Sequence, residues 1–203
     1  MTLIKSISGI RGTIGGKPGE NFTPVDVVKF TAAFGTYKKR NSKKAKNKIV
    51  IGRDGRISGD MVRNLVVGTL QGLGIDVIDL DLSTTPTVEI AVTEEKAIGG
   101  IILTASHNPK QWNALKLLNE KGEFISAKAG EEVLSIAEKE DFDFVIDVTQ
   151  LGKYTRKEGY FDIHIQKILN LPLVDVAAIT AAHFKIVVDC VNSTGGIVVP
   201  QLL

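Results

Sequence analysis

Short runs of Ile, Val and Leu recur along the first half of the chain, separated by segments of helical periodicity. The apolar runs cover residues 48–52, 75–82 and 97–105, and glycine or polar residues bound each of them. Runs of this length and composition predict buried strands. The segments between them, 58–74 and 85–96, predict helices. This alternation predicts a parallel sheet with helices on both faces and right-handed crossovers.

Capping residues indicate where the helices begin. Thr23 followed by Pro24 predicts an N-cap and a first-turn proline for a long helix. Ser58 is predicted to cap the next helix in the same way. Ser126 is predicted to cap a later helix that ends near residue 139.

The second half of the chain predicts two short strands, a helix and the start of a new unit. After Lys116, residues 120–122 predict a turn between two short strands, and residues 141–154 predict irregular or lightly extended backbone. Residues 157–169 predict an amphipathic helix. Residues 184–190 predict another buried strand, followed by the start of a helix.

Two parts of the chain are therefore expected. Residues 1–154 are predicted to form a three-layer α/β/α domain with a mixed, mainly parallel sheet. Residues 155–203 are predicted to form a linking helix and the truncated start of a second α/β domain. On this interpretation the chain ends just inside that second domain.

Composition narrows the class of protein. Of the 203 residues, 43% are hydrophobic and 24% are charged, which argues against a disordered chain. The single cysteine, Cys190, cannot form an internal disulfide and favours a reducing compartment. No apolar run approaches the roughly 20 residues of a membrane span, and the N-terminus lacks the features of a secretory signal. We therefore predict a cytoplasmic protein with no membrane partner.

Charge argues against a nucleic-acid partner. The chain has 25 basic and 23 acidic residues, a net charge of +2. Many of the basic residues lie in residues 38–48, and no aromatic residue interleaves with them. We interpret this run as the connection between a helix C-terminus, where cations are favoured, and the following strand. A patch for an anionic partner is the alternative.

The most informative segment is TASHNP, residues 104–109, which follows a predicted buried strand. Ligands of parallel α/β sheets bind beyond the carboxyl ends of the strands. Asn108 and Pro109 favour a tight turn, in which adjacent backbone N–H groups can face an anion. The imidazole of His107 adds a further donor. This chemistry would hold a phosphate on, or beside, the hydroxyl of Ser106.

Ser106 also has competing interpretations. As an isolated residue it is a turn or capping serine. A hydrolase nucleophile would need the G-x-S-x-G elbow, and the sequence A-S-H lacks both glycines. A catalytic triad would need a histidine that reaches the hydroxyl, but His164 and His183 lie in or after a predicted helix in the second half. A phosphate- or sugar-phosphate-binding module without covalent chemistry remains the main alternative.

Four motifs resemble the α-D-phosphohexomutases, the family of phosphoglucomutases, phosphomannomutases and phosphoglucosamine mutases. TASHNP resembles the active-site serine loop of that family. SGIRG (8–12) resembles its N-terminal arginine loop, and GRDGRISG (52–59) resembles its G-x-D-x-R-x-S-G segment. NALKLL (113–118) resembles the stretch that follows the serine loop. The four motifs occur in the family's order.

The resemblance implies an exchange between hexose 1-phosphate and hexose 6-phosphate, through a phosphoserine and a hexose bisphosphate that also serves as activator. It implies that Ser106 is the phosphorylated nucleophile and, through its phosphate, a ligand of Mg²⁺. Lys116 would be the general acid or base. Arg11 would stabilise the phosphate or the transition state, because its planar fork suits phosphate oxygens. His107 and Asn108 would contact substrate or phosphate.

The sequence also departs from the family. Ala114 stands where the family has glycine, and a positive φ there would cost about 1 kcal/mol or more. The family's D-x-D-x-D metal loop and its sugar-recognition loops belong to later domains and do not occur here. We interpret Asp79 and Asp81, an isolated D-x-D in a predicted strand, as structural.

The resemblance implies as partners a hexose phosphate and the remaining domains of the same protein. The chain alone is expected to be inactive as a mutase, and the sequence does not select among glucose, mannose and glucosamine.

Within GRDGRISG, we predict that Arg53, Asp54 and Arg56 form a buried ion-pair network that supports the serine loop.

Overall fold

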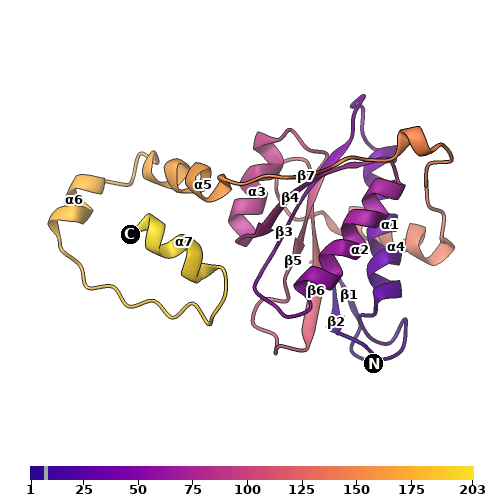
Figure 1. Ribbon diagram of the computed structural model, residues 1–203, viewed down its shortest axis with the longest axis horizontal. Helices are drawn as coiled ribbons and strands as arrows, with labels where there is room; N and C mark the ends of the chain where they lie inside the picture. Colours follow the sequence, from indigo (N-terminus) through magenta and orange to yellow (C-terminus); the bar gives the residue numbers. More distant parts are fainter. Residues whose placement is uncertain (7–8) are drawn as a thin grey trace.

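The chain forms a seven-stranded mixed sheet between layers of helices (Figure 1). The computed structural model describes residues 1–6 and 9–203. The strands are β1 (Ile4–Ser6), β2 (Gly9–Thr13), β3 (Lys48–Arg53), β4 (Asp76–Leu82), β5 (Gly99–Leu103), β6 (Trp112–Leu118) and β7 (Tyr154–Arg156). Their order is β1-β2-β6-β5-β3-β4-β7. Strands β5, β3, β4 and β7 pair in parallel, whereas β1, β2, β6 and β5 pair antiparallel. The predicted α/β class with a mixed sheet is confirmed.

Helices cover both faces of this sheet (Figure 1). One face carries α1 (Pro24–Arg40), α2 (Gly59–Gly72) and α4 (Ala127–Lys139), and the other carries α3 (Thr85–Glu94), against which α5 (Tyr160–Leu169) packs. Strand β3 serves both cores. Ile49 and Ile51 belong to the larger core under α1 and α2, and Val50 belongs to the smaller core under α3. Side chains alternate along a strand, so a strand buried on both faces is a continuous apolar run.

The helix starts agree with the sequence, with one difference in chemistry. Thr23 and Asp26 form a capping box, in which each side chain accepts the backbone N–H of the other. The Ser126 side chain accepts a first-turn amide of α4. Ser58 is the N-cap residue of α2, as predicted, but its side chain makes no capping hydrogen bond. Its Oγ instead accepts a hydrogen bond from Asn113 Nδ2 at 2.8 Å, which ties α2 to β6.

The basic run begins in the last turn of α1, and its first residues hold distant segments against the helix. Lys38 is buried and pairs with Glu120 at 3.0 Å. The ammonium of Lys39 donates to two backbone carbonyls, and Arg40 pairs with Asp141 and Asp143. These cations lie in the last turn of α1, where the helix dipole also favours them. The run is thus a connection, as interpreted, but with specific structural contacts.

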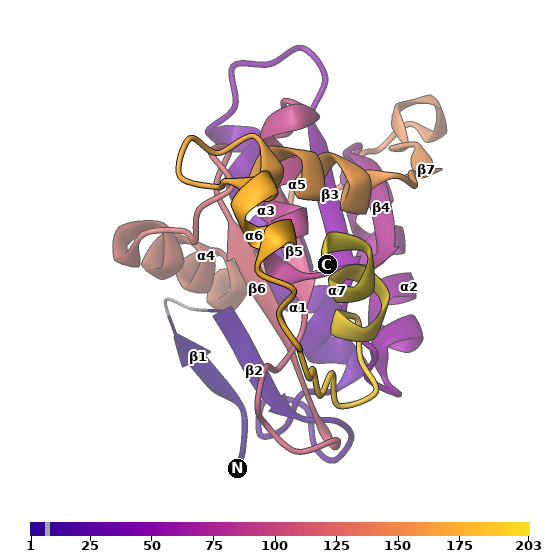
Figure 2. The same cartoon turned by 90° about the vertical axis from the view of Figure 1, so that its left-hand side faces the viewer.

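The predicted strand at 184–190 is wrong. These residues form no helix or strand, and large side chains among them are exposed, Phe184 by 67% and Val187 by 97%. They run between α6 (Val176–Ala181), which the sequence did not predict, and α7 (Gly195–Leu202), on the α3 side of the sheet (Figures 1 and 2). A strand needs neighbours that pair with its amide groups and cover its faces. No described strand does this for 184–190.

A cluster around Glu95 fastens the start of α5 to the end of α3. Glu95 accepts a hydrogen bond from the Tyr160 hydroxyl at 2.5 Å, pairs with Lys48 at 3.1 Å and also pairs with Lys157. Burial raises the pKa of the Glu95 carboxyl, but the hydrogen bonds from Lys157, Tyr160 and Lys48 together outweigh burial. They hold this pKa at about 2, against an ordinary value of 4.5.

Glu95→Gln is therefore expected to lower the free energy of unfolding by about 3 kcal/mol at neutral pH. A lowered folded-state pKa contributes stability above the ordinary value of 4.5, and this contribution is lost as the pH falls toward 2. Urea unfolding of both proteins across this range measures the difference. Glu94→Gln is the matched control, because Glu94 forms an exposed pair with Lys167 and should change stability by less than about 1 kcal/mol. A difference between wild type and Glu95→Gln that does not shrink with acid would contradict this account.

Candidate active site

Three chemically important side chains meet in one cavity beyond the carboxyl end of β5. Arg11 comes from β2, Ser106 from the loop after β5, and Lys116 from β6. The cavity has a volume of about 140 Å³. Its other lining residues are Gly9, Thr104, Ala105 and Ala114. The structure thus brings together three of the five site residues expected from the sequence.

Strand pairing explains why Arg11 and Lys116 share this cavity. Arg11 lies opposite Ala114 in the antiparallel pair of β2 and β6. Because side chains alternate between the faces of a strand, Ala114 and Lys116 lie on the same face, and Arg11 joins them there. The SGIRG segment was expected to be a loop, but from Gly9 onward it is part of strand β2. Its first residue, Ser8, lies outside the described residues.

Ala114 does not strain the site. It is 4% exposed, lies within β6 and is not among the residues of positive φ. The expected cost of alanine at this position therefore does not arise, because a regular strand accommodates any L-residue. The placement of Lys116, two residues further on, follows from ordinary strand geometry.

The backbone of Ser106 is left-handed, with φ of 55°, and the residue is exposed. Residues that carry a Cβ rarely adopt this conformation. The N–H of Ser106 donates to Thr104 Oγ1 at 3.2 Å. The N–H of Asn108 donates to the carbonyl of Ala105 at 3.1 Å and closes the turn. The tight turn expected from Asn-Pro is therefore present.

His107 and Asn108 do not line the cavity. His107, which follows Ser106 in the chain, is exposed. The side-chain oxygen of Asn108 is buried, and no described residue hydrogen-bonds to it. The roles expected for these two residues from the resemblance thus have no direct counterpart in the geometry of the cavity.

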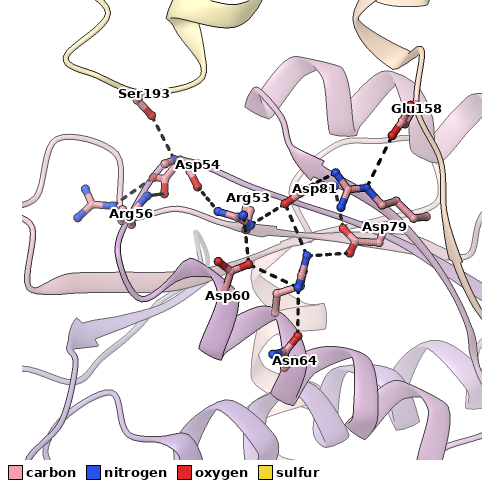
Figure 3. A network of polar contacts seen from close by, with 12 residues as sticks. Arg53, Asp54, Arg56, Asp60, Asn64, Asp79, Asp81, Glu158 and Ser193 are labelled. Atoms are coloured by element: carbon pink, nitrogen blue, oxygen red, sulfur yellow. Dashed lines mark hydrogen bonds and ion pairs between the residues drawn. The ribbon is translucent and has the colours of Figure 1, made fainter.

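The guanidinium of Arg56 lies against the serine loop. It donates to four backbone carbonyls at 2.7–2.9 Å, those of Ser106, Asn108, Pro109 and Trp112. Its Nε pairs with Asp54 at 3.1 Å, and Asp54 also accepts the Thr104 hydroxyl at 2.6 Å. The predicted network under the serine loop is confirmed for Asp54 and Arg56 (Figure 3).

Arg53 belongs to a neighbouring polar cluster at the end of β4 (Figure 3). It pairs with Asp81 at 2.8 Å and with Asp60 at 3.1 Å. Asp79 is fully buried and accepts the Tyr154 hydroxyl at 2.9 Å. Asp79 and Asp81 therefore both hold other segments of the fold in place, which confirms that they are structural. The described part of the chain contains no group of three or more His, Cys, Asp or Glu side chains placed to hold a metal ion.

Two contributors to the site went unnoticed in the sequence. Thr104 joins the Ser106 amide to Asp54, and its place two residues before Ser106 was the available signal. Gly9 forms part of the cavity wall with φ of 119°. A Cβ at Gly9 would lie 2.1 Å from the carbonyl oxygen of Leu115, so this close approach of β2 to β6 requires glycine.

Comparison with known families agrees with this geometry. Residues 3–144 match the family model described as phosphoglucomutase/phosphomannomutase, alpha/beta/alpha domain I. The chain belongs to this family. The matched range includes the serine loop and the strands that carry Arg11 and Lys116.

Relatives of this phosphoglucomutase/phosphomannomutase family member extend the match. A phosphoglucomutase/phosphomannomutase of Thermococcus kodakarensis is 36% identical over 95% of the chain, and a phosphoglucosamine mutase of Sulfurovum is 32% identical over 100% of it. The chain spans 41% and 44% of these relatives. The structure of parafusin, a phosphoglucomutase from Paramecium, superposes on the whole chain with a TM-score of 0.74 at 17% identity, which supports the fold. The chain covers 42% of that structure.

None of the described helices is both long and apolar enough to cross a membrane.

The side chains that line the cavity show whether it could hold a metal ion. Arg11 and Lys116 are cations, and the Ser106 hydroxyl lacks a nearby set of carboxylates. Mg²⁺ prefers oxygen ligands, with one or two carboxylates plus phosphate oxygens. The described residues therefore do not form a complete magnesium site by themselves.

Proposed function

We propose that this chain is the N-terminal part of a phosphohexomutase, which moves phosphate between the 1- and 6-positions of a hexose through a phosphoserine and a hexose bisphosphate. The observation that carries the proposal is the cavity shared by Arg11, Ser106 and Lys116. Charge spreads over the phosphate oxygens during phosphoryl transfer. A hydroxyl nucleophile beside two cations therefore suits the reaction.

Ser106 is the proposed acceptor. Its Oγ attacks phosphorus, and the bond from phosphorus to the sugar oxygen breaks as the bond to Oγ forms. Arg11 binds the transferring phosphate. Its Nε is buried and has no hydrogen-bond partner among the described residues, so donor capacity remains for a phosphate oxygen.

Lys116 is the proposed proton carrier between the serine hydroxyl and the sugar hydroxyl. Its ammonium lies over the ring of Phe124, 5.7 Å from the centroid, which directs the side chain. We propose that His107 and Asn108, which follow Ser106 in the turn, contact the substrate phosphate beside the cavity. Their position in the sequence motif supports this assignment.

Mg²⁺ is the proposed cofactor of the complete enzyme, where it neutralises phosphate charge. This chain would supply a single ligand, the phosphate on Ser106. The other ligands and the sugar-recognition loops would come from the remaining domains, in line with the 41% and 44% of its relatives that the chain spans. We propose a hexose phosphate as the substrate class and a hexose bisphosphate as the activator. A cytoplasmic location stays a prediction from Cys190.

In the complete protein, incubation with glucose 1,6-bisphosphate and Mg²⁺ is expected to leave one phosphoryl group on Ser106. Intact-mass analysis before and after phosphatase treatment measures it. The chain alone is expected to show no mutase turnover above a Ser106→Ala control, because the proposed metal and sugar loops lie in other domains.

Two results would contradict the proposal. Anion binding without any covalent phosphate would make the chain a phosphate-binding module. Mutase turnover of the chain alone, well above the Ser106→Ala control, would show that the remaining domains are not required.

A further inference from the structure

Both peptide groups that flank the α-carbon of Ser106 are tied to the same ion pair. Its N–H donates to the Thr104 hydroxyl at 3.2 Å, which in turn donates to Asp54 Oδ2 at 2.6 Å. Its carbonyl accepts from Arg56 Nη2 at 2.8 Å. Arg56 Nε donates to the same Asp54 oxygen at 3.1 Å. The two tethers close a ring of hydrogen bonds around Ser106.

We propose that Arg56, oriented by Asp54, is a positioning residue that holds Ser106 in its left-handed conformation. This conformation keeps Ser106 in the cavity that Arg11 and Lys116 line. The effect on phosphoryl transfer rests on the proposed function, whereas the effect on the Ser106 backbone does not.

The backbone geometry explains why such a device is needed. A left-handed φ is disfavoured for a residue with a Cβ, and it persists only where the surroundings over-determine it. Peptide groups are planar, so fixing the groups on both sides of Ser106 fixes its φ and ψ. Ser106 receives one constraint from Thr104 and one from Arg56.

The set of hydrogen-bond acceptors around the Arg56 side chain suits arginine specifically. A planar guanidinium has five N–H donors, and here it serves four carbonyls and one carboxylate. Lysine has a compact charge that cannot span these acceptors. The side chains of Arg56 and Asp54 are 11% and 17% exposed, so solvent screens their interaction weakly. Asp54 also accepts the backbone N–H of Arg56 at 3.0 Å, which fixes the pair locally.

The test compares Arg56→Met and Arg56→Lys with the control Arg63→Met. Arg63 is 20% exposed and pairs with Asp60, Asp79 and Asp81, away from the serine loop. The first readout is the intraresidue amide-to-α-proton Overhauser effect of Ser106 by NMR, which is strong at positive φ. The second is the rate of phosphoryl uptake by the complete protein from glucose 1,6-bisphosphate and Mg²⁺ at saturating concentration, measured by intact mass.

Wild type and Arg63→Met should retain the strong Overhauser effect, and both Arg56 variants should lose it. Uptake in Arg56→Met should fall about 100-fold, the effect of a displacement near 1 Å, with little change in the half-saturating concentration. If Arg56→Met does not fold, Arg56→Lys decides. A folded Arg56 variant that keeps the wild-type Overhauser effect overturns the proposal. Loss of the Overhauser effect in a folded Arg63→Met protein also overturns it. Absence of uptake in wild type would overturn the proposed function. The positioning role of Arg56 would then be judged by the NMR readout alone.

Discussion

In the complete protein, replacement of Ser106 by alanine is expected to abolish covalent phosphate on this chain segment and to slow phosphoryl uptake by at least about 10⁴-fold, the scale seen when a nucleophile is removed. The only other hydroxyl among the residues that line the described cavity belongs to Thr104, and it donates to Asp54 at 2.6 Å. It is therefore occupied and poorly placed to substitute. Intact-mass analysis over time after addition of glucose 1,6-bisphosphate measures the rate.

Ser83→Ala is the matched control for this substitution. Ser83 is 3% exposed, lies outside the active-site cavity, and its hydroxyl has no hydrogen-bond partner among the described residues. Its removal leaves no polar group unpaired, so uptake should be unchanged and stability should change by less than about 0.5 kcal/mol. Persistent phosphorylation of the Ser106→Ala protein would show that another residue is the acceptor.

Gly9→Ala is expected to lower the free energy of unfolding by about 3 kcal/mol and to impair phosphoryl uptake. The new Cβ would lie 2.1 Å from the carbonyl oxygen of Leu115 and 3.1 Å from the Cα of Lys116. The φ of 119° at Gly9 is also unfavourable for alanine. Strand β2 must therefore move away from β6, which displaces Arg11 from Ser106. Urea unfolding and intact-mass analysis measure the two effects.

Gly68→Ala provides the opposite expectation. Gly68 lies within α2, and a Cβ there would meet nothing within 4 Å. Alanine should therefore raise the free energy of unfolding by about 0.5–1 kcal/mol through its helix propensity and the reduced entropy of the unfolded chain. Equal effects of the two glycine substitutions would show that the close approach of β2 to β6 is not what constrains Gly9.

Local sequence patterns identified the central strands and the main helices. The buried strands β3, β4 and β5 are apolar runs because both of their faces are covered. The short strands β1 and β7 escaped notice for the converse reason. Each has three residues, all of them exposed, so neither carries a hydrophobic signature.

The segment 184–190 shows where an apolar run misleads. Its composition resembles that of β3, but no described strand pairs with it, and its side chains are largely exposed. Strand formation depends on partners as well as on composition, because the backbone amide groups must be paired.

The sequence by itself determined the family motifs and the identity of Ser106, Arg11 and Lys116 as candidate site residues. Only the tertiary structure decided that these three share a cavity, whereas His107 and Asn108 do not line it. It also decided that Arg56 reaches four carbonyls of the serine-loop region. The physical reason is that β2, β6 and β5 are distant in sequence but pair side by side in the sheet. The register of this pairing determines which of their side chains lie close together.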